Sequence, residues 1–495
     1  MIVDLLSSFG TMLAPTPLML LTIGTVLGVV IGAIPGLNGA MLVALSLPLT
    51  FGWSPLNAIA LLVGQYVGSI SGGLISATLL NIPGTPSNMM TMLDAGPMAR
   101  AGKPERALQL GILASFVGGL ISWLALVLLS PPLAHVALMF GPHEFFSLVL
   151  VALVLIASMS EGSMIRALIG AALGMLVAMP GLDPVTGQLR LDFRFPGMAG
   201  GFDLLAVLVG IFAVSQLLLD SGGKDNADRI RLAAKHVSMP LRDFFGHWKA
   251  VIRSSVIGTC VGILPGIGGS VGSIIAYTTA RNLSREPERF GTGIDEGVIA
   301  SETANNATIG GALIPMITMG IPGSIIDVIL IAALTLHDLR PGPLLFQSNP
   351  EIVYGFMSAM FLSNIVMLLV MLFSIRWLAK VIDTPKCYLV PVLLMFCVLG
   401  TYAVNNRMFD VGVMFAFGMV GILLRIMRIP TAPFVIGFIL TPIAEKSLRA
   451  ALIAEQGDWM TFLTRPISAG FLLMALIMLF LPLWQRTGRQ KSMPT

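Results

Sequence analysis

Four Pro-Gly pairs interrupt apolar stretches of this chain, at residues 35–36, 83–84, 265–266 and 322–323. Proline removes a helical hydrogen bond and glycine tolerates non-helical backbone, so each pair should leave backbone N–H groups without helical partners. A helix that starts directly after such a break offers these groups to an anion. Because no Lys or Arg adjoins the breaks, the expected donors are backbone N–H groups with Ser, Thr and Asn side chains.

The candidate anion-binding residues are therefore the small and polar residues around the four breaks. They comprise Gly36, Asn38 and Gly39; Pro83, Gly84, Thr85 and Ser87; Gly266, Gly268, Gly269 and Ser270; Asn305 and Asn306; and Gly323 and Ser324. In the alternative interpretation the Pro-Gly pairs are kinks and the small residues are helix contacts. Four breaks at matching places in two halves favour a binding site.

Acidic residues inside apolar segments are a second signal, because ionisable groups in a membrane are rare and usually functional. Glu302 and Asp327 are candidates for coupling transport to a cation. Asp327 could equally cap the helix that follows the last break. Backbone carbonyls around Pro35, Pro265 and Pro322 could hold Na⁺ without an acid. The coupling ion is left as Na⁺ or H⁺, and no cofactor is expected.

The composition excludes a soluble protein. The chain has 495 residues, of which 56% are hydrophobic and 11% are charged, and residues 5–93 contain no Asp, Glu, Lys, Arg or His. Mean hydropathy is +0.89. We expect an all-α polytopic membrane protein with roughly 12–15 membrane segments, some of them broken or re-entrant. The net charge of +4 does not indicate nucleic-acid binding, because Lys and Arg lie between the spans.

Apolar runs locate these segments. The candidate spans are 16–34, 37–51, 55–81, 107–130, 144–160, 164–182, 204–219, 250–266, 268–281, 295–320, 352–376, 388–404, 408–424, 430–446 and 466–485. The spans 37–51 and 268–281 are short enough to be re-entrant. Residues 183–203 are polar and Gly-rich and predict a hairpin-like periplasmic loop.

The breaks indicate an internal duplication. Pro265 follows Pro35 by 230 residues, and Pro322 follows Pro83 by 239. Lys and Arg follow the second break in the first half but lie between the breaks in the second half. Because Lys and Arg mark the cytoplasmic side, the two copies should be inverted, as in inverted-repeat secondary transporters. The same rule predicts a periplasmic N-terminus and a cytoplasmic C-terminus.

The duplication defines the predicted domains. These are a first repeat at 1–219 (broken arm 16–94, spans 107–219), a basic cytoplasmic connector at 220–249, a second repeat at 250–446 (broken arm 250–337, spans 352–446), and an unpaired last span with its cytoplasmic tail at 447–495.

Three long motifs resemble the large membrane subunit of the tripartite tricarboxylate transporters, the TctA family. They are GAIPGLNG at 32–39, LLNIPGTPS at 79–87 with DAGPMA at 94–99, and SETANNATIGGALIPMITMGIPGS at 301–324. The likeness extends over nearly the whole chain and includes DPVTGQLRLDF at 183–193. It implies a bacterial inner-membrane carrier that uses a cation gradient to import organic carboxylates. It also implies two partners, a small membrane subunit and a periplasmic binding protein.

Two other classes remain open from the sequence. One is a stand-alone anion channel, or a carrier with a non-carboxylate substrate. The other is an intramembrane enzyme, since Ser71-Gly72 is similar to the Gly-x-Ser-Gly of intramembrane proteases. Position 69 is Ser, however, and the spans that follow contain no His to act as a base. The chain is therefore expected not to be an enzyme but to transport by alternating access.

Overall fold

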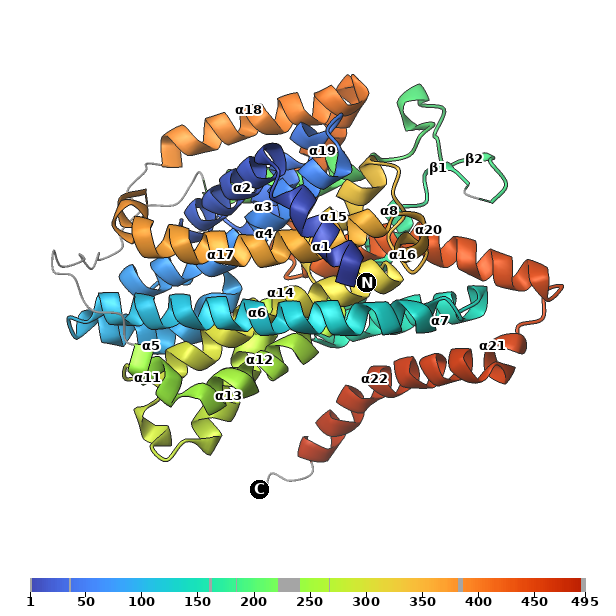
Figure 1. Cartoon of the computed structure of the whole chain (residues 1–495). Helices are drawn as coiled ribbons and strands as arrows, with labels where there is room; N and C mark the ends of the chain where they lie inside the picture. Colours follow the sequence, from blue (N-terminus) through green and yellow to red (C-terminus); the bar gives the residue numbers. More distant parts are fainter. Residues whose placement is uncertain are drawn as a thin grey trace. The chain divides into compact units, whose positions relative to one another are not determined.

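The computed structural model describes residues 2–34, 37–159, 163–183, 185–220, 241–266, 268–381 and 386–490. These parts are almost entirely α-helical, with one short two-stranded ladder, which confirms the predicted all-α class (Figure 1). The chain separates into two compact units. Unit 1 comprises Met1–Ala134 and Phe212–Arg407, and unit 2 comprises His135–Ile211 and Met408–Thr495.

Unit 1 holds all four predicted breaks. Its helices are α1 (Ile2–Met12), α2 (Pro15–Ala33), α3 (Gly39–Ser46), α4 (Pro55–Leu79), α5 (Met89–Arg100), most of α6 (Pro104–Ala137), α10 (Ser215–Asp220), α11 (Leu241–Gly246), α12 (Trp248–Ile263), α13 (Gly268–Leu283), α14 (Asp295–Met319), α15 (Ile325–Leu336), α16 (Leu345–Ser348), α17 (Pro350–Val381) and α18 (Lys386–Asn405).

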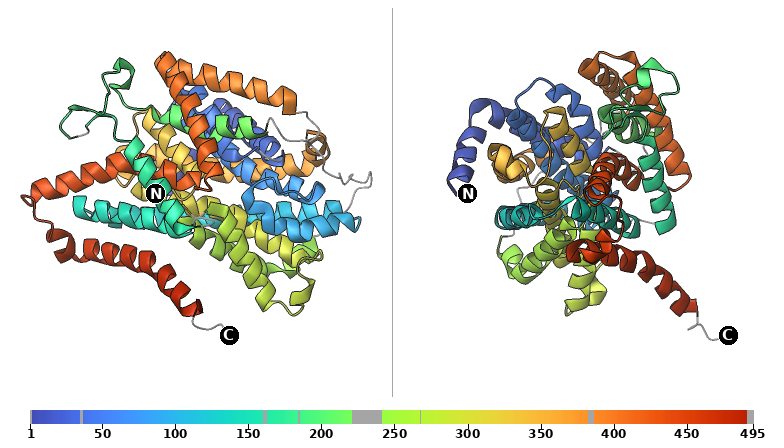
Figure 2. Two further views of the ribbon diagram at one scale, coloured as in Figure 1. Left: turned by 180° about the vertical axis from the view of Figure 1, so that it is seen from behind. Right: turned by 90° about the vertical axis from the view of Figure 1, so that its right-hand side faces the viewer.

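The elements of unit 2 are α7 (Pro142–Met159), α8 (Met164–Val177), β1 (Gly181–Leu182), β2 (Leu189–Arg190), α9 (Leu204–Leu208), α19 (Met408–Ile426), α20 (Thr431–Ala454), α21 (Thr461–Thr464) and α22 (Pro466–Gln490). Helix α7 packs against α8, α20 and α22. Figure 2 shows α22, in red, turning back after α21 at the end of α20.

The observed helices lie close to the spans expected from hydropathy. Among the described residues, five helices are long and apolar enough to cross a membrane: α2, α4, α6, the Pro350–Phe373 part of α17, and α19. Helix α3 has eight residues and is about 12 Å long, too short to cross a bilayer. This agrees with the re-entrant interpretation. The helices α1, α5 and α15 were not among the expected spans.

Glycines bring helix backbones of unit 1 into direct contact. A β-carbon on Gly28 of α2 would lie 2.6 Å from the carbonyl oxygen of Gln65 in α4. A β-carbon on Gly258 of α12 would lie 2.4 Å from the carbonyl oxygen of Ala304 in α14. The second glycine follows the first by 230 residues, and the second carbonyl follows the first by 239. The α2–α4 and α12–α14 pairs therefore use the same close packing.

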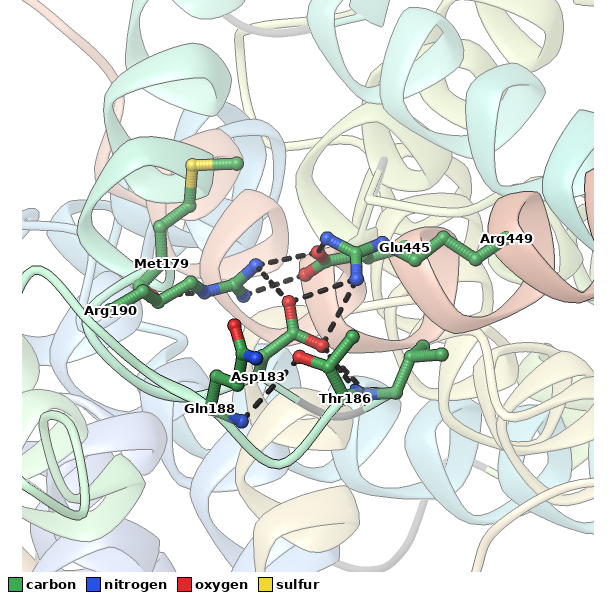
Figure 3. Close-up of polar contacts among 8 residues, drawn as sticks. Met179, Asp183, Thr186, Gln188, Arg190, Glu445 and Arg449 are labelled. Atoms are coloured by element: carbon green, nitrogen blue, oxygen red, sulfur yellow. Dashed lines mark hydrogen bonds and ion pairs between the residues drawn. The ribbon is translucent and has the colours of Figure 1, made fainter.

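In unit 2 the expected hairpin-like loop is present. Gly181 pairs with Arg190 in the antiparallel ladder of β1 and β2. The Arg190 guanidinium donates to both carboxylate oxygens of Glu445, at 2.6 and 2.7 Å, and to the Met179 carbonyl at 2.7 Å. Figure 3 shows how this fork fastens the loop to α20.

Asp183 completes this polar network. Its Oδ1 accepts from the backbone N–H groups of Val185 and Thr186, at 2.9 and 2.8 Å. Its Oδ2 lies 2.9 Å from the guanidinium of Arg449 (Figure 3). The hydrogen bonds from Thr186 and Val185, followed by the Arg449 charge, lower the pKa of Asp183 to about 2. Asp183 is therefore an ionised anchor for the start of the loop.

We expect this anchor to fail only in strong acid. A lowered pKa contributes stability above the ordinary value of 3.8, and that stability is lost as the pH falls through about 2. The measurement is the rate of pepsin cleavage within 189–195, relative to Asp183→Asn. The wild type should be cut more slowly than the variant at about pH 4, and the two rates should converge near pH 2. A rate ratio independent of pH would contradict this role of Asp183.

Candidate functional site

Every predicted break is present in the helices of unit 1. In the first arm α2 ends at Ala33 and α3 begins at Gly39. Pro35 and Gly36 lie outside the described residues. The remaining breaks separate α4 from α5, α12 from α13, and α14 from α15. Between α4 and α5 a 3-10 turn, η2, covers Pro86–Asn88.

The residues at these breaks explain why one helix ends and the next begins. Helix α14 ends at Met319 and is capped by Gly320, which has a φ of 71° in the left-handed region that glycine adopts without strain. The next helix begins after Ser324, whose side chain accepts from the Asp327 N–H at 3.3 Å. Asn38 caps α3 in the same way, accepting from the Met41 N–H at 2.8 Å. Such caps replace the hydrogen bonds that an interrupted helix lacks.

The tips of the two arms meet. A β-carbon on Gly39 of the first arm would lie 3.1 Å from Ile326 of the second arm. A β-carbon on Gly269 of the second arm would lie 3.2 Å from Ser87 of the first arm. The two contacts are matching ones, because Gly269 follows Gly39 by 230 residues and Ile326 follows Ser87 by 239. The structure thus brings predicted site residues from both arms together.

One tip contact is polar on every side. Around Gly269 stand Ser87, Asn305 and Thr308, and a β-carbon on Gly269 would lie 2.7 Å from the Asn305 amide oxygen. Asn305 is fully buried, and its amide interacts with the Glu302 carboxylate but makes no hydrogen bond of ordinary geometry. A buried amide without a partner is unfavourable in an apolar protein interior. This position is therefore suited to receive a ligand.

The matching tip contact is less polar. Around Gly39 lie Ser69, whose hydroxyl donates to the Tyr66 carbonyl at 3.0 Å, and the apolar Ile326. The Tyr66 hydroxyl is 2.9 Å from the hydroxyl of Ser324. The first tip is thus internally satisfied, whereas the second retains an amide without a hydrogen bond of ordinary geometry. Of the predicted binding residues, Ser87, Gly269 and Asn305 form the more polar tip site.

Glu302 is the centre of a buried hydrogen-bond network. Its Oε1 accepts from the Asn88 amide at 2.8 Å and the Thr91 hydroxyl at 2.6 Å. Its Oε2 accepts from Ser115 at 3.1 Å. Asn88 in turn accepts from Thr85. The three donors come from different segments, so Glu302 joins α14 to the first arm and to α6.

Asp327 has a different environment. It is fully buried in α15, and neither carboxylate oxygen accepts a hydrogen bond of ordinary geometry. The carboxylate lies near Ser324 and the backbone of Gly323, as expected for an acid in the first turn of a helix. Tyr66 is close enough to interact with it electrostatically. The matching residue in the first arm is the neutral Asn88, 239 positions earlier.

The other predicted site residues have structural contacts. Asn306 accepts from Ser71 at 2.6 Å and donates to the Glu302 carbonyl at 3.2 Å. The Gly266 N–H donates to the Gly323 carbonyl at 2.9 Å. A β-carbon on Gly84 would lie 2.5 Å from the carbonyl oxygen of Gly32, so this position is closed to larger residues. Pro83, Gly268, Ser270 and Pro322 lie at the same breaks, and Pro265 lies in the turn after α12.

Sequence reasoning missed the polar residues that hold the tips together. Tyr66, Asn88, Thr91 and Ser115 were not selected, because single hydroxyl and amide groups in apolar helices are common. The 239-residue offset from Asp327 to Asn88 was the available signal. Asp94, at the start of the DAGPMA motif, is fully buried.

The Asp94 carboxylate binds the backbone of the segment between α13 and α14. Its Oδ1 accepts from the backbone N–H groups of Gly291, Gly293 and Ile294, at 2.9, 2.9 and 3.1 Å. Its Oδ2 accepts from the Tyr277 hydroxyl at 2.8 Å. Helix α5 of the first arm is therefore hydrogen-bonded to the segment between α13 and α14 of the second arm.

Comparison with known proteins identifies the family. One relative is described as an uncharacterized 52.8 kDa protein in the TAR-I ttuC' 3' region of Agrobacterium vitis. It is 35% identical over 480 residues, covering 96% of this chain and 95% of the relative. A second, from the TAR-II ttuC' 3' region of the same organism, is 34% identical over 226 residues, covering 46% of this chain and 93% of the relative.

No solved structure matches the chain. A model of the tripartite tricarboxylate transporter TctA family matches residues 18–436. The match covers both broken arms and all four breaks, which are the parts of the chain that form the tip contacts. This chain therefore belongs to the tripartite tricarboxylate transporter TctA family.

Proposed function

We propose that this chain is the permease subunit of a bacterial inner-membrane carrier that imports organic carboxylates by alternating access. It works with a small membrane subunit and a periplasmic binding protein, and a cation gradient drives it. Membership of a transporter family supports this class over an enzyme. The single observation that carries the proposal is the buried Asn305 amide, which makes no hydrogen bond of ordinary geometry, beside Gly269 and Ser87, where the two arms meet.

The duplicated contacts support the inverted-repeat part of the proposal. Gly32 of α2 touches the Ser69 carbonyl, and Gly262 of α12 touches that of Thr308, again at offsets of 230 and 239. Two copies built from the same contacts give a carrier two equivalent halves that can exchange conformations. A channel does not require this equivalence. The orientation of the repeats in the membrane follows from the distribution of Lys and Arg.

The tip site suits a carboxylate. Amide and hydroxyl groups of Ser87 and Asn305, with N–H groups at the start of α13, can donate to carboxylate oxygens. Asp327 is our candidate for the coupling cation, because its buried charge has no cationic partner among the described residues. The hydroxyl groups of Tyr66 and Ser324 lie beside it and can supply further oxygen ligands.

Reconstitution tests the function. The chain, its small membrane subunit and its binding protein are placed in proteoliposomes with labelled citrate and an imposed Na⁺ or H⁺ gradient. We expect saturable accumulation that requires all three proteins and one of the gradients. Passive flux without saturation would identify a channel. Accumulation without either cation gradient would disprove cation coupling.

A single substitution tests whether the first break also faces the substrate. Asn38→Asp keeps a side-chain oxygen that can accept from the Met41 N–H, so the α3 cap should survive. The new charge should repel a nearby carboxylate by about 3 kcal/mol, lowering uptake more than a hundredfold at unchanged protein level. Asn38→Ala is the control, because it removes the cap without adding charge. Undiminished uptake by Asn38→Asp would remove Asn38 from the site.

A further inference from the structure

Unit 1 has a large basic cavity about one helix length away from the tip contacts. The cavity has a volume of about 970 Å³. It is lined by the ends of α5, α12, α13 and α14 that lie opposite the breaks. Helix α13 has 16 residues and is therefore about 24 Å long. The same four helices thus connect the cavity with the tip where Ser87 meets Gly269.

The charge of the cavity is strongly positive. Six cationic side chains line it, against the three acids Glu286, Asp295 and Glu296. Each acid forms an ion pair with one of the six, and Arg106 also pairs with Asp243 of α11, leaving three cations over. Among the described residues, Lys103, Lys249 and Arg285 form no ion pair, and all three are exposed. Unpaired cations around a concave surface concentrate the field and attract anions.

The matching place in the other half is chemically different. It is a pocket of about 10 Å³ lined mainly by apolar residues, between α4, α15 and α17. The two places correspond, because Ile294 follows Pro55 and His337 follows Met98 by 239 residues each. Ile294 and Met98 line the basic cavity, and Pro55 and His337 line the small pocket. The described lining of this matching pocket contains no Lys or Arg.

We propose that the basic cavity is a second anion-binding site, separate from the tip site, that takes a small di- or tricarboxylate on the cytoplasmic side. Its three unpaired cations match the charge of a tricarboxylate. Their long side chains are exposed, so binding should be weak, rapidly reversible and sensitive to salt. A released substrate would pause here, and a high internal concentration would keep the cavity filled. The carboxylate identity rests on the proposed function, whereas the existence of an anion site does not.

A cysteine reporter tests the site without requiring transport. Ser284 lines the cavity, and Ser284→Cys is made with Cys260, Cys387 and Cys397 replaced by Ala. Its rates of reaction with an anionic and a cationic methanethiosulfonate reagent are measured in inside-out and right-side-out vesicles. We expect faster reaction with the anionic reagent from the cytoplasmic side, and slowing by citrate but not by inorganic phosphate at equal ionic strength.

Matched variants identify the cations. Replacing Lys103, Lys249 and Arg285 by Gln should reduce the preference for the anionic reagent roughly tenfold and remove protection by citrate. The control replaces three exposed cations outside the cavity, Arg166, Arg340 and Lys446, by Gln.

Three results would overturn the proposal. The cavity variant could keep its preference for the anionic reagent, the control variant could lose that preference to the same extent, or phosphate could slow the reaction as much as citrate does. Citrate protection in a chain that transports no organic carboxylate would refute the proposed function and leave the cavity site intact.

Discussion

Asp327→Asn should abolish gradient-driven uptake while the protein folds normally. The substitution gives the second arm the residue type that the first arm has at Asn88, so the backbone should tolerate it. Asp327 makes no hydrogen bond of ordinary geometry through its carboxylate, and an Asn oxygen can keep its weaker contacts with Ser324 and Gly323, so little stability is lost. Removing the charge that holds the cation should cost about 3 kcal/mol, a reduction in coupled uptake of about a hundredfold. Labelled-substrate uptake in proteoliposomes measures this effect.

Glu302→Gln is the matched control for the loss of a buried acid. A Gln oxygen can still accept from Asn88 and Thr91, and its amide can donate to Ser115. Uptake should therefore remain within a fewfold of the wild type. Asp327 lies in α15, which packs against α3, α4 and α14. The titratable side chains of these three helices are Tyr66, Asp295, Glu296 and Glu302. Full coupling in Asp327→Asn with loss in Glu302→Gln would reverse the two roles.

Asn305→Ala should weaken substrate binding without destabilising the protein. The Asn305 amide makes no hydrogen bond of ordinary geometry, and the Glu302 carboxylate beside it keeps Asn88, Thr91 and Ser115 as donors, so its removal should cost little stability. If this amide donates to the substrate, affinity should fall by about 1.5–3 kcal/mol, roughly ten- to a hundredfold. The two measurements are the substrate concentration for half-maximal uptake and the midpoint of thermal unfolding in detergent.

The neighbouring Asn306 should respond in the opposite way. Asn306→Ala removes the acceptor for Ser71 and a donor to the Glu302 carbonyl. It should cost about 1–3 kcal/mol of unfolding free energy and alter substrate affinity little. Two adjacent asparagines with opposite effects would separate ligand binding from helix packing. Equal thermal destabilisation by both variants would show that Asn305 is a packing residue.

The sequence predicted the helices well because a membrane imposes a strong pattern. Apolar runs and Pro-Gly breaks placed the ends of α4, α13 and α14 within three residues of their observed positions. The breaks also located both arm tips, since backbone that leaves a helix in an apolar segment must have a special reason. Hydropathy did not separate α5 and α15 as helices, because each is short and follows a break.

The hydrogen-bond partners of the buried polar groups could not be predicted from the sequence. Glu302 and Asp327 looked alike as acids in apolar stretches, but only the fold supplies Asn88 and Ser115 to one of them. Those donors lie 214 and 187 positions away along the chain. No local pattern records a contact of that length. The same holds for Asp94, whose partners follow it by 183 to 200 positions.

The hydrogen bonds of Asp94 join helices from the two halves of the chain, and this has a consequence for how the protein can be assembled. Helix α5 belongs to the first arm but packs against α13 and α14, and α15 belongs to the second arm but packs against α3 and α4. Each broken arm thus completes its surface with a helix from the other half of the gene product. A fragment ending at residue 219 would lack the helix α15 and expose the faces it covers. We therefore expect the first half to complete its packing only after the second half has been synthesised.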